Sequence, residues 1–125
     1  MNKERRLRSS REFAAVRRDG RSWADRLLVL VSRRNKLDIT RFGFIVSKRV
    51  GNAVVRNKVR RRLREAARLS RVKCGWDLVF IARQGASSAD YRGLSGSMKG
   101  LLTRANVLDG SPGTHGEYSE RAEAR

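Results

Sequence analysis

The spacing of apolar residues divides the chain into helical and extended segments. Near the start, Ser9 and Glu12 have the spacing of a capping box, in which each side chain bonds the backbone of the other residue. Phe13 and Val16 then fall on one helical face, and Gly20 is a stop signal. These features predict a short first helix.

Three later runs have the length and rhythm of strands. Residues 27–31 (LLVLV) and 78–82 (LVFIA) are apolar at every position, which is typical of strands buried on both faces. Residues 42–46 alternate in strand rhythm. Because residues 35–38 (NKLD) separate the first two strand patterns of the chain, we expect a hairpin loop there.

The longest helical pattern is also the most basic. Asn52 follows Gly51 and is a candidate N-cap for a helix that runs toward Leu69. At about 100° per residue, one side carries an apolar stripe made of Val55, Val59, Leu63 and Ala66. The other side gathers Asn57, Arg60, Arg61, Arg64 and Arg68. The pattern predicts an amphipathic helix with one cationic face.

The last third of the chain predicts one more helix and then a tail. Ser87 and Asp90 are candidate caps for a helix whose core stripe would be Tyr91, Leu94, Met98, Leu101 and Leu102. From Val107 onward the sequence turns to Gly, Ser, Pro and acidic residues. We therefore expect a single folded domain over residues 1–106 and a disordered acidic, Gly- and Ser-containing tail over 107–125.

The charge of the chain indicates a function for this small fold, the binding of nucleic acid. The 125 residues carry a formal net charge of +18, and residues 48–64 hold eight Lys or Arg and no acid. Such a surface repels itself and attracts phosphate strongly. We therefore expect a polyanionic partner, with nucleic acid first among the possibilities.

The sequence offers little for catalysis by the protein itself. Cys74 is the only cysteine and His115 the only histidine, so an internal disulfide and a zinc site are excluded. The acids are scattered, and no Gly-rich phosphate loop is present.

No run reaches the roughly 20 apolar residues of a membrane-spanning helix, and the N-terminus lacks an apolar signal core. We expect a cytoplasmic protein with no membrane association and no metal ligands or catalytic residues of its own.

Residues 46–65 (VSKRVGNAVVRNKVRRRLRE) strongly resemble the signature of the bacterial ribonuclease P protein component. The resemblance extends to the pattern made by Arg6, Leu7, Ser10 and Phe13, and to residues 77–83 (DLVFIAR). It implies an α+β fold, a single-domain αβββαβα two-layer sandwich with a left-handed crossover around the basic helix, related to a domain of ribosomal proteins.

The resemblance also implies a function. The family belongs to an endoribonuclease whose catalyst is a large RNA subunit, which with Mg²⁺ removes the 5′ leader of precursor tRNA. The protein subunit binds the catalytic RNA through the basic motif, and it binds the leader in a cleft between the first helix and the sheet. Mg²⁺ is then expected chiefly on the RNA subunit and the substrate, and no catalytic residue is expected on the protein.

Carried over by position, the expected contacts to the catalytic RNA are Lys48, Arg49, Arg56, Asn57, Lys58, Arg60, Arg61, Arg62 and Arg64, and Arg68 extends the same face. Arg62 projects near the apolar stripe and would have to reach past it. Phe13 matches a cleft aromatic that stacks on a leader nucleotide, although a core contact from the first helix explains it equally well.

This chain departs from the family at two positions of the expected cleft. Arg17 and Val31 stand where the family often has aromatic residues. Leader binding would then depend more on charge, unless Trp23 turns into the cleft rather than into the core.

Two other classes fit the charge alone. A ribosomal or general RNA-binding protein would show the same basic helix without a preferred substrate, and co-purification with the ribosome rather than with one non-coding RNA would identify it. A basic module on an anionic membrane surface fits less well, because the apolar stripe of the basic helix is needed for the core.

Overall fold

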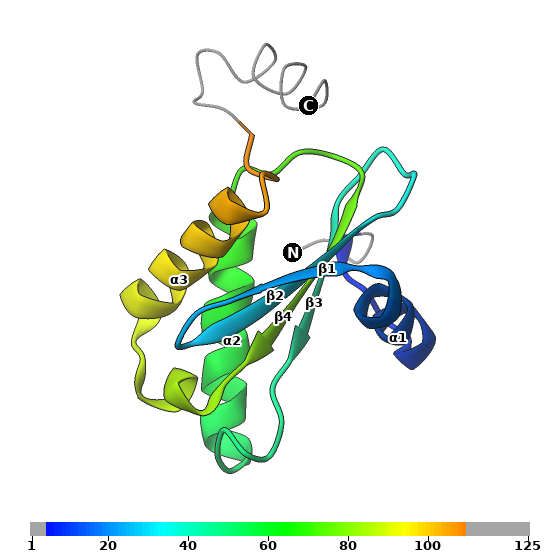
Figure 1. The fold of residues 1–125 in the computed structure, drawn as a ribbon. Coiled ribbons are helices and arrows are strands. Elements are labelled where there is room, and N and C mark those ends of the chain that lie inside the picture. The colour runs from blue at the N-terminus through cyan, green and yellow to red at the C-terminus, as the bar shows by residue number, and fades with distance from the viewer. Residues whose placement is uncertain (1–4, 110–125) are drawn as a thin grey trace.

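The structure, a computed structural model that describes residues 5–109, is a four-stranded mixed sheet with helices on both faces (Figure 1). In chain order the elements are α1 (Ser10–Asp19), β1 (Arg21–Ala24), β2 (Leu28–Arg34), β3 (Arg41–Ile45), α2 (Ala53–Leu69), β4 (Trp76–Ala82), the short 3₁₀ helix η2 (Gln84–Ser88) and α3 (Tyr91–Arg104). The expected α+β class and the order αβββαβα are confirmed.

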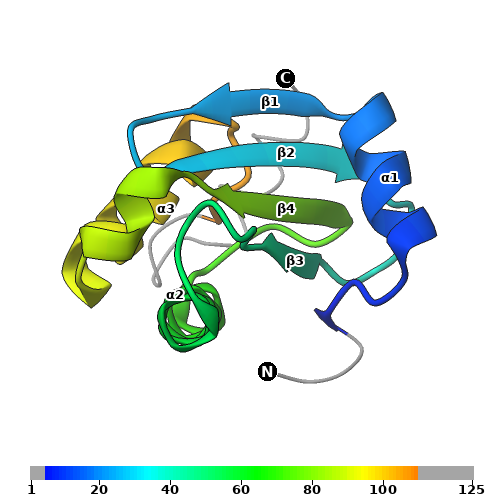
Figure 2. The same cartoon turned by 90° about the horizontal axis from the view of Figure 1, so that it is seen from below.

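The strands lie in the order β1-β2-β4-β3, which Figure 2 shows from below. β2 pairs antiparallel with β1 and with β4, whereas β3 runs parallel to β4 and reaches it through α2. The hairpin predicted at residues 35–38 is therefore wrong. Local spacing predicted two adjacent strands, but β4 arrives later in the chain and lies between them.

The larger core lies between the sheet and the helices α2 and α3. Asn52 caps α2 by accepting a 3.0 Å hydrogen bond from the Val55 N–H, and Val59, Leu63 and Ala66 are buried as predicted. In α3 the cap is Asp90, which accepts from the Gly93 N–H at 2.8 Å. The buried stripe of α3 consists of Leu94, Met98, Leu101 and Leu102.

One predicted cap of α3 is wrong. Ser87 lies within η2, where its hydroxyl donates to the Gln84 carbonyl at 2.9 Å, so it has no part in starting α3.

The opposite face of the sheet is covered by α1 (Figure 1). The predicted capping box is present, and the chain leaves the helix at Gly20. A smaller cluster packs here, with Leu7, Val16, Val31 and Val79 buried.

The packed structure extends past the predicted boundary at residue 106. Val107 is fully buried, Leu108 pairs with Val72, and the Asp109 N–H donates to the Arg71 carbonyl at 2.9 Å. The apolar pair Val107-Leu108 anchors this stretch, which the polar composition of the following residues concealed. The rest of the predicted tail, 110–125, lies outside the described residues.

Candidate nucleic-acid interface

The outward face of α2 and the turn before it form a cationic surface. Its exposed members, all predicted, are Lys48, Arg49, Asn57, Lys58, Arg61, Arg64 and Arg68. Glu65 is the one acid in α2, and the 2.6 Å ion pair with Arg68 lowers the pKa of its carboxyl. Arg68 is therefore compensated within the helix, and the uncompensated charge lies nearer the N-terminal end.

A close approach of backbone to side chain fixes the turn that carries Lys48 and Arg49. The Val50 N–H donates to the Ser47 carbonyl at 3.0 Å, which closes the turn. A Cβ on Gly51 would lie 2.8 Å from the Val55 side chain, so only glycine allows the turn to pack this closely on α2. The turn and the helix thus form one basic surface.

Three of the predicted contacts are half-buried and differ from the exposed set. Arg62 donates to the Ala89 carbonyl at 2.9 Å, so its guanidinium is bound to the segment before α3. Arg56 has its Nε enclosed, with no hydrogen-bond partner among the described residues. Arg60 donates to Asn57 Oδ1 at 3.2 Å and approaches the Val46 carbonyl at 3.5 Å, which brings it toward the edge of the sheet.

A groove of about 450 Å³ opens between α1, the edge strand β3 and α2. Its walls are Arg8, Ser10, Phe13, Ala14, Arg17, Phe44, Ile45, Val46 and Arg60. The two residues predicted for a cleft, Phe13 and Arg17, therefore share a groove with Arg60 of the basic helix. Arg8 is a basic wall residue that the sequence pattern did not single out.

Phe13 is half-buried, and its position is compatible with both of the roles that the sequence left open. A Cβ on Gly43 of β3 would lie 2.5 Å from the Phe13 ring, so the ring rests directly on the backbone of the strand. The same ring lines the groove. It is thus held from beneath and accessible from the side, as a stacking platform must be.

The two other residues considered for the cleft lie away from it. Val31 is buried under α1 in the small cluster with Val16. Trp23 packs against the core on the α2 and α3 side and carries Arg21 over its ring at 5.6 Å, so it does not replace the missing aromatic.

A second hollow, of about 550 Å³, lies where β4 ends. It is lined by Arg26, Ser47, Arg49, Ile81, Ala82, Arg83, Gln84 and Gly85. Arg49 therefore connects the basic turn to this hollow, which adds Arg26 and Arg83 to the predicted set. Arg83 ends the conspicuous run at residues 77–83 and could have been noticed there, whereas no local pattern singles out Arg26.

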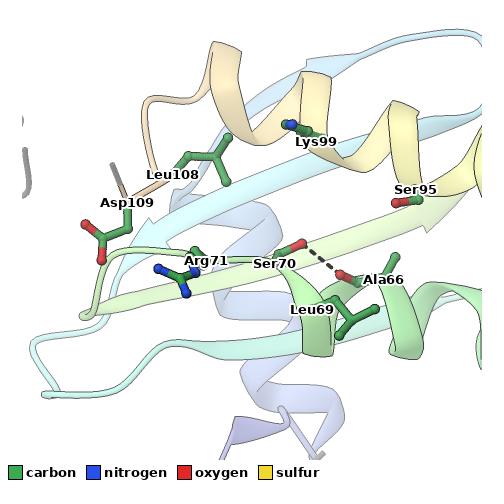
Figure 3. A pocket seen from close by; sticks show the side chains of 8 residues that line it. All are labelled: Ala66, Leu69, Ser70, Arg71, Ser95, Lys99, Leu108 and Asp109. Carbon is green, nitrogen blue, oxygen red and sulfur yellow. Dashed lines mark hydrogen bonds between the residues drawn. The ribbon is translucent and has the colours of Figure 1, made fainter. Parts of the chain in front are cut away.

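A third hollow, of about 420 Å³, lies between α2, α3 and the segment at Leu108 (Figure 3). It contains none of the predicted site residues. Its floor is fixed by a 2.8 Å hydrogen bond from the Ser70 hydroxyl to the Ala66 carbonyl.

Charged side chains join α1 to the sheet beside the groove. Arg41 of β3 donates to Glu12 at 2.8 Å and to Asp77 of β4 at 2.8 and 2.9 Å. The backbone N–H groups of Arg8 and Ser9, and then Arg41, lower the pKa of Glu12, while hydrogen bonding to Asp77 raises that of Arg41. Both groups are therefore held in their charged forms.

Residues 5–109 lack the features of two other kinds of site. They contain no group of three or more His, Cys, Asp or Glu side chains placed to hold a metal ion. None of the helices there combines the length and apolar character needed to cross a membrane.

The fold and this surface define a class of protein, a small basic α+β domain in which a cationic helix adjoins a groove with an aromatic wall. Comparison with known proteins specifies the family. Residues 1–106 match the family model described as Ribonuclease P. The chain belongs to the ribonuclease P protein family.

Individual relatives agree along nearly their whole length. The ribonuclease P protein component of Roseiflexus castenholzii is 46% identical over 114 residues, covering 89% of this chain and 93% of that protein. That of Clostridium botulinum is 42% identical over 110 residues, covering 86% and 99%.

Solved structures show the same fold. The RNase P protein of Staphylococcus aureus superposes with a TM-score of 0.77 at 33% identity, covering 84% of this chain and 98% of that one. The RNase P protein of Thermotoga maritima gives 0.73 at 31% identity, covering 79% and 96%.

Proposed function

We propose that this chain is the protein subunit of a ribonucleoprotein ribonuclease P, which binds the catalytic RNA and the 5′ leader of precursor tRNA. The RNA subunit, with Mg²⁺, hydrolyses the bond that releases the leader. The protein contributes binding and positioning. Family membership supports the first part of this proposal, and the arrangement of the groove supports the second.

The observation that carries the proposal is the position of Arg60. It belongs to the cationic helix and also lines the groove that holds Phe13 and Arg17. One surface can therefore hold two RNA segments side by side, the catalytic RNA on α2 and a single strand in the groove. A general RNA-binding helix would not need an aromatic groove at its flank.

The chemistry of the two parts differs. The exposed Lys and Arg of α2 replace counterions on RNA phosphates, which makes binding to the catalytic RNA tight and dependent on salt. The Phe13 ring offers a face on which a leader base stacks, a contact worth about 1–3 kcal/mol. Arg17, in place of a second aromatic, provides charge and a planar group that also stacks on unpaired bases.

Leader binding in the groove explains how such a protein would favour substrate over product. Mature tRNA has lost the leader and with it every contact to Phe13 and Arg17. The basic surface also reduces the repulsion between two RNA molecules, a task that otherwise falls to Mg²⁺. The protein would therefore matter most at low Mg²⁺.

The test is cleavage of precursor tRNA by the cognate ribonuclease P RNA at low Mg²⁺, with and without this protein, using a long and a very short leader. We expect the protein to restore cleavage and to favour the long leader. Phe13→Leu, which keeps an apolar contact on Gly43 but cannot stack, should reduce that preference.

Two results would contradict the proposal. Tight RNA binding without any enhancement of cleavage would favour a general RNA-binding role. Cleavage by the protein free of RNA would place the chemistry on the protein.

A further inference from the structure

A row of charges crosses the sheet beneath α1. Arg41 of β3, Asp77 of β4 and Arg33 of β2 are direct cross-strand neighbours. All three lie on the face that α1 covers, because the next residues on that face are Gly43, Val79 and Val31. The Asp77 side chain is completely buried.

Both ends of α1 are linked to this single carboxylate. At the first turn, Arg41 bridges Glu12 and Asp77 with hydrogen bonds of 2.8 to 2.9 Å, using Nε and Nη2 on Asp77 and Nη1 on Glu12. At the last turn, Arg33 lies 3.6 Å from Asp19 and 3.7 Å from Asp77. The first link is a charge-assisted, bidentate contact, and the second is an ion pair of longer reach.

The stronger link meets the part of α1 that carries the groove aromatic. Glu12 precedes Phe13 in the chain, and its other oxygen accepts from the backbone N–H groups of Arg8 and Ser9 at 3.0 and 3.2 Å. The carboxylate therefore joins the helix cap to Arg41. The apolar packing beneath α1 is small. Within residues 5–109 its buried members are Leu7, Val16, Val31 and Val79, with the half-buried side chains of Phe13, Val29, Ile45 and Ile81 packed against them.

We infer that the row Arg41–Asp77–Arg33 positions α1 on the sheet. It thereby holds Phe13 and Arg17 at the distance from the sheet that binding of the leader requires. Arg41 is a positioning residue in this arrangement, which touches no RNA itself. The inference rests on the proposed leader-binding function of the groove. It adds to that function a source of rigidity in the sheet beneath α1, beside the groove.

Arg41→Lys tests the inference without removing the positive charge at position 41, so the buried Asp77 carboxylate keeps a cationic partner there. A single ammonium cannot reproduce the three N–H contacts that the guanidinium divides between two carboxylates. The link to Glu12 should be lost while the sheet remains intact. Arg92→Lys, an exposed position on α3, is the matched control, and Arg33→Lys tests the longer link.

Two measurements separate positioning from general stability. Amide hydrogen exchange of the protein alone should become roughly tenfold faster in α1 of Arg41→Lys, with α2 unchanged, as expected for the loss of one charge-assisted hydrogen bond. In the holoenzyme, the preference for the long leader should fall by roughly tenfold, whereas affinity for the catalytic RNA stays within about twofold. Arg33→Lys should give smaller changes of the same kind.

Each alternative result decides a different question. Unchanged exchange in α1 together with an unchanged leader preference would overturn the inference, as would equal losses of leader preference and RNA affinity. If the wild-type holoenzyme shows no leader preference, the proposed function of the groove fails, and the exchange rates still decide whether Arg41 holds α1.

Discussion

The two faces of the sheet are stabilised in different ways. On the α2 and α3 side, eighteen buried apolar residues of the described stretch 5–109 form one core, which includes Phe42 and Phe80 of the sheet. On the α1 side, four buried apolar residues are joined by a row of charges. The packing on the first face is stabilised by the large apolar area that it buries. The packing on the second face depends on the geometry of a few charged contacts.

Each part of the proposed interface therefore obtains its rigidity from a different source. The cationic helix is held in place by its buried stripe. Substitution of its exposed basic side chains should therefore leave the stability of the fold unchanged. The groove is bounded by a short helix on the weaker face. Changes on that face should therefore alter the groove before they unfold the domain.

The prediction with the greatest effect concerns one core truncation on each face of the sheet. Leu63→Ala should lower the free energy of unfolding by about 2–5 kcal/mol, because Leu63 is fully buried in the large core. Val31→Ala, beneath α1, should cost about 1–2 kcal/mol, since fewer methyl groups are lost. Urea unfolding at equilibrium measures both. Equal melting of wild type and Leu63→Ala would contradict the assignment of the core.

The second prediction concerns the cationic face. Arg61→Ala combined with Arg64→Ala should leave stability unchanged and reduce the slope of log affinity against log salt by about two, because two phosphate contacts are removed. Titration of the catalytic RNA at several salt concentrations measures the slope.

Arg62→Ala is the control on the same helix. It removes the same type of charge, but its guanidinium is bound to the Ala89 carbonyl, so we expect a loss of stability and a smaller change in slope. Equal slope changes for Arg62 and for either exposed arginine would show that Arg62 also contacts RNA.

The smallest effect is the pH dependence of the α1 face. The pKa of Glu12 lies below its ordinary value of 4.5, so its contribution to stability is complete above that pH and is lost as the pH falls through the lowered value. The stability difference between wild type and Glu12→Gln should therefore narrow by less than about 1 kcal/mol between pH 6 and pH 3, given the exposure of this pair to solvent.

Glu65→Gln serves as the comparison on α2. The Glu65 and Arg68 pair is exposed, so we expect its pH dependence to be weaker. Urea unfolding across this pH range decides the prediction. A larger effect at Glu65 than at Glu12 would contradict the prediction.

Local patterns predicted the elements better than their arrangement. The capping box at Ser9 and the N-cap at Asn52 were predicted because they depend on residues three apart. The partner of β2 was not, since nothing within residues 27–46 indicates a strand that comes thirty residues later. Local patterns gave no sign of β1 either, because a short exposed strand with one half-buried residue, Trp23, lacks an apolar rhythm. The resemblance alone implied three strands before the basic helix.

The site shows the same division. Spacing on α2 predicted the exposed residues Arg61, Arg64 and Arg68, and the resemblance added Lys58. The resemblance also predicted Phe13 and Arg17. The meeting of Arg60 with these two depends on the edge position of β3, and the hollow that adds Arg26 to Arg49 depends on the end of β4. The row of Arg41, Asp77 and Arg33 could not be predicted from the sequence, because these residues become neighbours only through the register of β2, β3 and β4.

That register also has an evolutionary consequence. Asp77 is fully buried, so a sequence that loses Arg41 or Arg33 alone keeps a carboxylate without its full compensation, and one that loses Asp77 alone leaves two like charges side by side. Positions 33, 41 and 77 are therefore not free to drift independently. Among related sequences, a neutral residue at position 77 should be accompanied by neutral residues at 33 and 41, a covariation that marks the attachment of α1.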